Sequence, residues 1–314
     1  MNTAGVDYSI AGKVFILGEY AVLRGLPALV AATSPRFALR SAARNGSVVG
    51  KTNHTEYAPA SPAGRFLHWA CKNPSDIPFE FIDPLLGAGG FGASTAQFAL
   101  LVELELGQVG WKRAWELYRK LMTPSESPVS ADAAGAAGIP PSGADLVAQW
   151  QGGVQLFDPT KATTEDLTQA LSWSDFLIFS ATGIAGRKVA THEHLAKLQN
   201  FSTESLEKPL FDGIAAIRAG DRARLGQCLG QYADALHELG FENPSAHEDR
   251  KILGKISGVL GIKGAGAMQS DSMILLCEKS ADRSKIMSAA ESRGLRLISE
   301  HCFPAQGIQC VRPE

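Results

Sequence analysis

The stretch that decides the fold is the glycine-rich run at residues 87–96, which reads Gly-Ala-Gly-Gly-Phe-Gly-Ala-Ser-Thr-Ala. It follows a short apolar run at 79–82 and leads into residues 95–106, where apolar side chains recur at spacings of three and four and predict a helix. Glycines let a backbone wrap closely around phosphate, and the first turn of the following helix offers free N–H groups to an anion. The run therefore predicts a phosphate site, with a purely structural glycine turn as the alternative.

Two other nucleotide motifs compete with this interpretation: a dinucleotide site, which would make the chain a dehydrogenase and is disfavoured, and a P-loop, which is excluded. Gly87, Gly89 and Gly92 satisfy G-x-G-x-x-G, but a dinucleotide site also needs a second strand that ends in an acid about 20 residues further on. Residues 108–114 lie at that distance and are predicted to be helical or to lie between helices. Residues 46–52 resemble a P-loop, yet one residue too few separates their glycines and no helix is predicted directly after them.

Glycines also frame two charged residues near the N-terminus. Residues 11–25 read Ala-Gly-Lys-Val-Phe-Ile-Leu-Gly-Glu-Tyr-Ala-Val-Leu-Arg-Gly. Lys13 and Glu19 bracket an apolar strand, so the ends of one short hairpin can present both charges to one cleft. The alternative is an exposed lysine and a glutamate in a turn.

Two later segments carry related signals. Residues 262–271 read Ile-Lys-Gly-Ala-Gly-Ala-Met-Gln-Ser-Asp and precede an apolar strand, which by itself is compatible with a simple hairpin turn. Residues 140–145 read Pro-Pro-Ser-Gly-Ala-Asp, which puts Asp145 just inside a predicted helix. The alternative there is that Ser142 caps the helix and Asp145 only favours its dipole.

The rest of the chain alternates strand and helix patterns. Strands are expected at residues 14–17, 28–32, 37–43, 79–82, 154–157, 176–180, 273–276, 295–298 and 308–311. Helices are expected at residues 95–106, 111–122, from Ser142, 206–239 as two helices divided near Gly220–Asp221, and 285–292. This order predicts an α+β protein of two lobes, residues 1–165 and 166–314.

Composition narrows the function classes. The chain has 314 residues, 30 Lys+Arg against 32 Asp+Glu, and a formal net charge of −2, so neither nucleic acid nor an anionic membrane is an expected partner. No secretory leader or membrane span is apparent, and the five cysteines lack a CxxC pair. We therefore expect a cytoplasmic protein with buried free thiols. A homodimer is compatible with the sequence, which leaves the oligomeric state open.

Taken together and in this order, the four segments resemble the motifs of the GHMP kinases, the superfamily of galactokinase, homoserine kinase, mevalonate kinase and phosphomevalonate kinase. Residues 12–25 resemble the N-terminal motif, residues 90–96 the G-L-G-S-S-A-A phosphate loop, residues 141–145 the P-S-G-x-D segment, and residues 263–271 the C-terminal glycine motif. The resemblance spans most of the chain. It implies two α+β lobes with the active site between them, and transfer of a phosphoryl group from ATP to a small molecule.

The resemblance also implies roles for individual residues. Asp145 would accept the proton of the attacking hydroxyl or orient it, and Lys13 would pair with Asp145. Ser94 would contribute an oxygen to Mg²⁺. The residues implied to bind ATP are Gly87, Gly89, Gly90, Gly92, Ala93, Ser94 and Thr95.

The sequence signals for the acceptor point to two different enzymes of the superfamily. Residues 18–23 resemble phosphomevalonate kinase, whereas residues 141–145 resemble mevalonate kinase. We favour phosphomevalonate, with mevalonate as the alternative, which would place the protein in the isoprenoid pathway. The residues implied to bind the acceptor are Glu19, Tyr20, Ser142, Gly143, Arg187 and Lys188; a solvated basic turn is the alternative for the last two.

Some positions depart from the superfamily pattern. Mevalonate kinases place a Mg²⁺-binding glutamate where this chain has Ala133 or Ala134, and Asp132 is the nearest acid. Residues 267–269 read Ala-Met-Gln where the superfamily favours glycines. These departures keep a further alternative open, a divergent or non-catalytic relative that binds a metabolite.

Overall fold

The fold contains two antiparallel sheets. The computed structural model describes residues 7–41, 57–123, 140–172, 175–182, 198, 200–301, 303 and 306–311. The first sheet has the order β10-β1-β2-β4-β5, with β3 also paired to β2, and the second has the order β7-β8-β6-β9. Strands of the first sheet are β1 (Asp7–Leu17), β2 (Ala28–Ser41), β3 (Phe79–Ile82), β4 (Val154–Asp158), β5 (Thr163–Asp166) and β10 (Gln309–Val311). Strands of the second are β6 (Phe176–Ser180), β7 (Val259–Ala265), β8 (Ser272–Cys277) and β9 (Arg296–His301).

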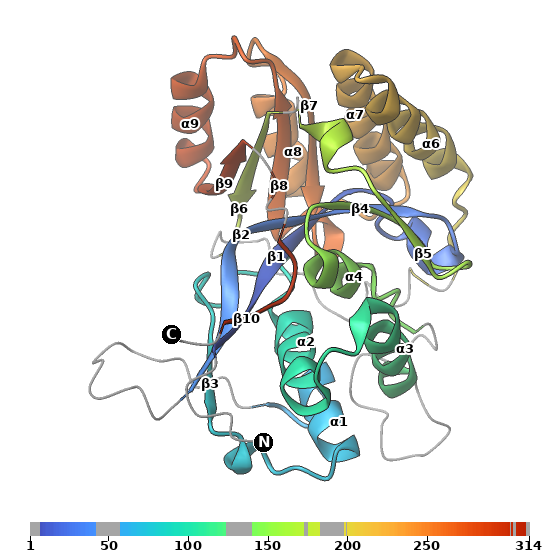
Figure 1. The fold of residues 1–314 in the computed structure, drawn as a ribbon. Helices are drawn as coiled ribbons and strands as arrows, with labels where there is room; N and C mark the ends of the chain where they lie inside the picture. Colours follow the sequence, from blue (N-terminus) through green and yellow to red (C-terminus); the bar gives the residue numbers. More distant parts are fainter. Residues whose placement is uncertain are drawn as a thin grey trace.

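The helices divide into two groups. Figure 1 shows the first group beside the first sheet, in the lower half of the view, and the second group around the second sheet, in the upper half. The first group is α1 (Pro62–Trp69), α2 (Ala93–Leu106), α3 (Gly110–Met122) and α4 (Ala144–Gln151). The second is α6 (Glu204–Ala219), α7 (Arg222–Glu238), α8 (Pro244–Leu253) and α9 (Arg283–Ser292). The predicted α+β architecture is confirmed.

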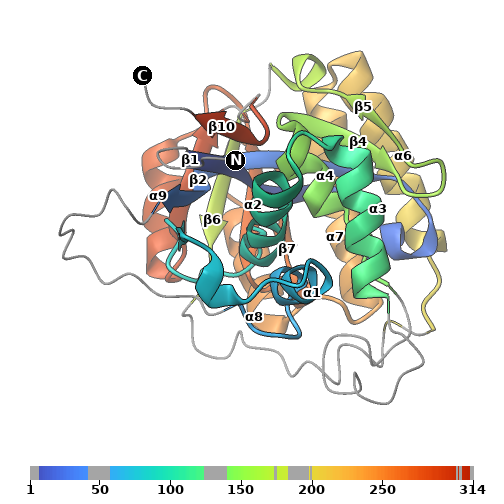
Figure 2. The ribbon, with the colours of Figure 1, turned by 60° about the horizontal axis from the view of Figure 1, so that its bottom comes forward.

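The core of the first group is α2. Every residue from Thr95 to Glu103 is buried, as expected for a helix that is covered on all sides. This helix contacts β1 and β2 of the first sheet as well as α1 and α4, and Figure 2 shows it among these elements. Its Phe98 ring packs edge-on against Phe66 of α1 and Tyr118 of α3, with centroids 5.8 and 5.2 Å away. The glycine-rich loop therefore leads into a helix that is buried from Thr95 to Glu103.

Several elements differ from those expected. The two strands predicted at 28–32 and 37–43 form one strand, β2, which continues past Pro35. Helices α1 and α8 were not predicted, although Ser61 and Asn243 cap them and a proline follows each cap. Strand β10 pairs with β1, so the last strand of the chain returns to the first sheet, whereas β9 lies in the second.

The described cysteines are free thiols, but only two of the four are buried, Cys228 and Cys277. Cys71 and Cys310 are exposed, so the expectation of buried thiols is wrong for them. Among the described residues, no helix combines the length and apolar character needed to cross a membrane.

Replacing Phe98 by alanine should destabilise the fold, because Phe98 is fully buried and the substitution leaves a cavity between α1, α2 and α3. We expect a loss of about 3–5 kcal/mol in the free energy of unfolding, measured by urea denaturation. Phe211, which is 48% exposed, provides the control, and Phe211→Ala should cost much less. Equal losses for the two variants would contradict the central position of α2.

Candidate active site

The phosphate loop ends at the first turn of α2. Gly92 is the N-cap residue, has a φ of 83° that favours glycine, and provides no side chain to cap the helix. The first N–H groups of a helix have no partner within it, so this uncapped end can bind an anion. Ser94, at the second helical position, is exposed. Its hydroxyl makes no hydrogen bond within the described part of the chain, so it is free to bind a ligand.

Lys13 lies directly behind this loop. Its backbone N–H donates to the carbonyl of Phe91 at 3.0 Å, and a Cβ on Gly92 would be 2.9 Å from Lys13 Cγ. The side chain is 8% exposed, with its ammonium 5.0 Å from the centroid of the Phe15 ring. The N-terminal motif and the phosphate loop are therefore packed together, and only glycine at 92 fits over the lysine stem.

The predicted ion pair between Lys13 and Asp145 is not formed. No nitrogen of Lys13 lies within 4.0 Å of the Asp145 carboxylate, and Thr95 in the first turn of α2 instead donates its hydroxyl to Asp145 Oδ2 at 2.8 Å. The other carboxylate oxygen accepts the N–H of Leu146 at 3.0 Å. These bonds hold the carboxylate at the start of α4 and against the first turn of α2, and not beside Lys13.

A buried phenol lies next to this carboxylate. Burial raises the pKa of Tyr118, and the Asp145 charge raises it further, while a hydrogen bond with Thr95 opposes the shift. Tyr118 therefore keeps its proton at neutral pH. Thr95, Tyr118 and Asp145 form one polar cluster in which α2, α3 and α4 meet.

The residues before Asp145 have structural contacts. Gly143 is the N-cap of α4 with a φ of 70°, and a Cβ there would be 2.7 Å from the Trp115 ring. Trp115 donates its indole N–H to the carbonyl of Ser142 at 2.8 Å, and the Ser142 hydroxyl accepts the N–H of Ala144 at 3.3 Å. Trp115 thus holds the turn that precedes Asp145. The Ser142 hydroxyl is hydrogen-bonded within this turn.

Glu19 does not face a cleft as predicted, because its carboxylate is held in the interior. Lys263 of β7, fully buried, donates to Glu19 Oε1 and to the carbonyl of Gly264. Gln269 donates its side-chain N–H to the same Glu19 oxygen at 2.9 Å. Burial lowers the pKa of Lys263, and the Glu19 charge opposes this shift. The pair joins the N-terminal motif to the C-terminal glycine motif.

Tyr20 is also buried and serves the same junction. Its hydroxyl accepts the backbone N–H of Met268 at 2.8 Å, and its ring stacks on Phe241 with centroids 4.5 Å apart. Burial raises the pKa of Tyr20, so the phenol stays protonated. Tyr232 of α7 donates its hydroxyl to the carbonyl of Glu19 at 2.8 Å. Glu19 and Tyr20 thus position the C-terminal motif rather than lining an open surface.

The C-terminal motif reaches the phosphate loop through a residue to which the sequence assigned no role. Asp271 packs against Gly89 and Gly90, so that the loops of both sheets meet at this side chain. Three further residues were missed, namely Gln149, Lys263 and Gln269. Gln149 is fully buried and donates to the carbonyl of Ala11 at 2.8 Å and to that of Gly92 at 3.3 Å. The only sequence signal for Gln149 is that a polar residue stands among the mostly apolar residues of α4.

Some predicted site residues cannot be placed. Arg187 and Lys188 lie outside the described residues, as do Asp132, Ala133 and Ala134. A Cβ on Gly87 would meet no atom within 4 Å, so its φ of 82°, and not crowding, accounts for glycine there.

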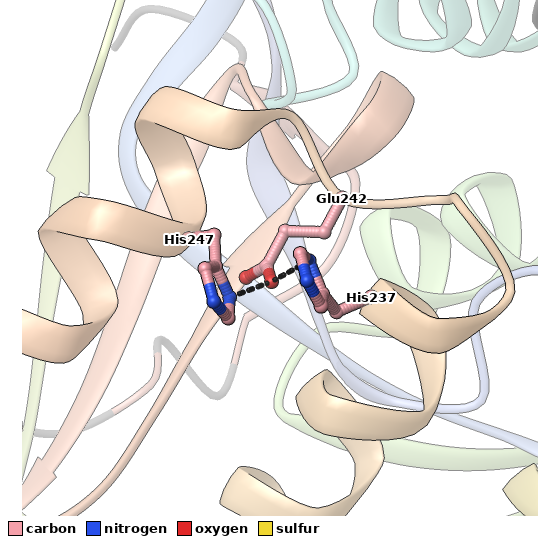
Figure 3. Close-up of side chains that lie close together, drawn as sticks. All are labelled: His237, Glu242 and His247. Carbon is pink, nitrogen blue, oxygen red and sulfur yellow. Dashed lines mark hydrogen bonds and ion pairs between the residues drawn. The ribbon is translucent and has the colours of Figure 1, made fainter.

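A separate cluster of titratable groups lies behind the C-terminal motif. Figure 3 shows His237 at the end of α7 and His247 of α8 on either side of Glu242, one oxygen of which lies 3.3 Å from Nδ1 of His237 and 2.7 Å from Nδ1 of His247. Arg250 also donates to both oxygens of this buried carboxylate, at 2.8 and 3.1 Å.

This cluster is a hydrogen-bonded network and not a preformed metal centre. The two imidazole rings are stacked 3.7 Å apart with an angle of 7° between their planes. A metal ion binds an imidazole nitrogen in the ring plane, so two parallel rings cannot both direct a nitrogen at one ion. The Arg250 guanidinium, 3.1 Å from His247 Nδ1, adds a positive charge at the same point.

A cavity of about 390 Å³ lies away from the glycine motifs, between β5 and α6. Its lining includes Phe211, Ile214 and the paired Arg218 and Glu165. None of the motif residues lines this cavity, so it is not the site that the sequence predicts.

No family model matches the chain, and a search of curated proteins finds no relative of it. Its structure nevertheless matches solved structures over nearly its whole length. Streptococcus pneumoniae phosphomevalonate kinase in complex with phosphomevalonate and AMPPNP is 16% identical with a TM-score of 0.67, covering 94% of this chain and 99% of that one. Methanococcus jannaschii mevalonate kinase is 13% identical with a TM-score of 0.65, covering 96% and 99%.

A third match comes from sugar metabolism. Lactococcus lactis galactokinase complexed with galactose is 15% identical with a TM-score of 0.67, covering 99% of this chain and 96% of that one. The chain therefore has the fold of the GHMP kinases, as its motifs predicted. At these identities the likeness concerns the fold alone.

Breaking the Glu19–Lys263 pair from either side should destabilise the protein, because each change leaves a buried charge without its partner. We expect Glu19→Gln and Lys263→Met each to cost about 3–5 kcal/mol of unfolding free energy, and the double variant to cost much less than their sum. Urea denaturation of the four proteins measures this coupling. Lys161→Met removes an exposed ion pair with Asp158 and should change little. Additive losses would show that the two residues act independently.

Proposed function

We propose that this chain is an ATP- and Mg²⁺-dependent kinase that transfers a phosphoryl group to a small molecule, with phosphomevalonate as the acceptor. The observation that carries the proposal is the hydrogen bond from Thr95 to Asp145. It joins the carboxylate of the P-S-G-x-D segment to the first turn of a helix whose N-terminus is uncapped. A candidate proton acceptor and a candidate phosphate site are thus held side by side.

The phosphate loop fits a nucleotide in its donor set. Bound MgATP would supply the phosphoryl group. The N–H groups of Ala93, Ser94 and Thr95 would bind phosphate oxygens at the positive end of α2. The glycines at 87, 89, 90 and 92 would let the backbone approach these oxygens, and the exposed Ser94 hydroxyl would be an oxygen ligand for Mg²⁺.

Asp145 and Lys13 would act on the reacting groups. The acceptor hydroxyl would give its proton to Asp145 as its oxygen bonds to phosphorus and the bond to the leaving ADP breaks. For an acceptor phosphate, which is already largely ionised at neutral pH, Asp145 would orient rather than deprotonate it. Lys13, behind Gly92, would offset the negative charge that gathers on the phosphates.

Two observations favour phosphomevalonate as the acceptor. Residues 18–23 resemble phosphomevalonate kinase, and one structural neighbour is that enzyme with phosphomevalonate bound. Arg187 and Lys188 are the cations proposed to bind its phosphate. Mevalonate is the second candidate, favoured by residues 141–145.

A non-catalytic metabolite binder is the candidate from another class. It is favoured by Met268 and Gln269, which have φ of 51° and 56° where the superfamily has glycines, and by the alanines at 133 and 134. Non-glycine residues are uncommon in this conformation. The bonds from Met268 to Tyr20 and from Gln269 to Glu19 give these two residues a structural reason to be there.

A coupled assay of ADP release separates the candidates. The purified protein is incubated with MgATP and, in turn, mevalonate, its 5-phosphate, its diphosphate, homoserine and simple sugars. The proposal expects the highest kcat/KM with mevalonate 5-phosphate. A preference for mevalonate would select the second candidate, and no ADP release with any acceptor, while the protein still binds nucleotide, would select the binder.

Asp145→Asn should lower kcat by at least about 10²-fold if the acceptor is the hydroxyl of mevalonate, because the amide cannot take up the proton, and by less if it is the phosphate of mevalonate 5-phosphate, which Asp145 only orients. The affinity for the nucleotide should change little. Asp166→Asn, an exposed substitution on β5, is the matched control and should leave kcat unchanged. Full activity in the Asp145 variant would remove this residue from the chemistry.

A further inference from the structure

Asp271 has an unusual location for an acidic residue, because it is enclosed by glycine loops that otherwise suit an anion. A Cβ on Gly89 would be 2.9 Å from Asp271 Oδ1, and a Cβ on Gly90 would be 2.9 Å from Asp271 Cβ. A Cβ on Gly266 would collide with the same side chain. The phosphate loop and the C-terminal motif thus close around one carboxylate, and glycine is needed at all three positions to make room for it.

The negative charge of the Asp271 carboxylate is only partly offset by its neighbours. Asp271 Oδ2 accepts the N–H of Ala267 at 3.2 Å. Within the described residues no lysine, arginine or histidine nitrogen lies within 4.0 Å of it. Burial raises the pKa of Asp271, and the Ala267 N–H and the charge of Lys13 lower it. The carboxylate therefore accepts one backbone N–H and has no cationic side chain as a close partner in the described part of the chain.

The neighbouring residue adds a second oxygen. Ser272 is fully buried, and its hydroxyl has no hydrogen-bond partner among the described residues. Its Oγ would be 3.1 Å from a Cβ on Gly90. A buried hydroxyl without a hydrogen-bond partner is unfavourable, so a group that bonds to it would be favoured.

The charge of Asp271 indicates which kind of ligand could bind between this carboxylate and a phosphate. Two negative charges that lie close together in a partly buried site repel each other, so a bare carboxylate would weaken phosphate binding by the same loop. A divalent cation between them reverses the sign of this interaction. Mg²⁺ prefers oxygen ligands and is commonly held by one or two carboxylates together with phosphate oxygens.

We propose that Asp271 is the acidic residue that binds the divalent cation at the phosphate loop, with the Ser272 hydroxyl beside it. This rests on the proposed function, since it assigns the metal that accompanies the nucleotide. It also supplies from the C-terminal motif the acid that Ala133 and Ala134 lack. The competing explanation is structural, with Asp271 serving only to hold the turn at Ala267.

Asp271→Asn tests the proposal, because the amide oxygen can still accept the Ala267 N–H while the charge is lost. Mn²⁺ binding to the protein with AMPPNP is followed by electron paramagnetic resonance, and AMPPNP binding by calorimetry with Mg²⁺ or with EDTA. We expect the variant to bind Mn²⁺ at least about tenfold more weakly. In EDTA it should bind AMPPNP more tightly than the unaltered protein, since the repulsion is gone. A purely structural role predicts no such reversal.

The matched control is Asp83→Asn. Asp83 lies just before the phosphate loop and accepts the N–H groups of Leu85 and Gly87, both at 2.8 Å, so its replacement should leave the metal dependence unchanged. If Asp271→Asn does not fold, Asp271→Ser replaces it. If a folded Asp271 variant binds AMPPNP with unaltered dependence on the metal, Asp271 is not the metal ligand, while the proposed kinase function still stands. Failure of the unaltered protein to bind AMPPNP with any metal would instead overturn the proposed function.

Discussion

A lysine and a glutamate pair in the interior of this protein, where neither charge would be stable alone. Lys263 comes from the second sheet and Glu19 from the turn that follows β1 of the first sheet, and their pairing ties the two sheets together. Gln269, Tyr20 and Tyr232 add hydrogen bonds around them. The pair therefore fixes where the C-terminal glycine motif lies, and with it the distance of Asp271 from the phosphate loop.

The geometry of the candidate active site depends on this pair and on glycines, which have no side chain, at three positions of the loop. Gly92 lies over the stem of Lys13, while Gly89 and Gly90 lie against Asp271, so side chains at these positions would force the segments apart. On the other side of α2, Trp115 and Thr95 hold Asp145 at the start of α4. Charges that are far apart in the sequence are thus brought around one uncapped helix end.

Local patterns predicted much of this fold. The strand at 176–180 and the division of 206–239 at Gly220–Asp221 agree with β6 and with α6 and α7, because a short apolar run, helical spacing and helix caps are local properties. The Glu19–Lys263 pair joins residues 244 positions apart, and no local signal pairs them. The expected Lys13–Asp145 pair is not formed for the same reason. The packing of α2 against α4 places Thr95 next to Asp145, and no local sequence pattern indicates this contact.

A crystal structure of the protein with AMPPNP and Mg²⁺ tests the proposed site most directly. The phosphates should lie on the N–H groups at the start of α2, with the cation between them and Asp271, and Lys263 should remain paired with Glu19. Phosphates bound elsewhere, for example in the cavity between β5 and α6, would contradict the proposed site.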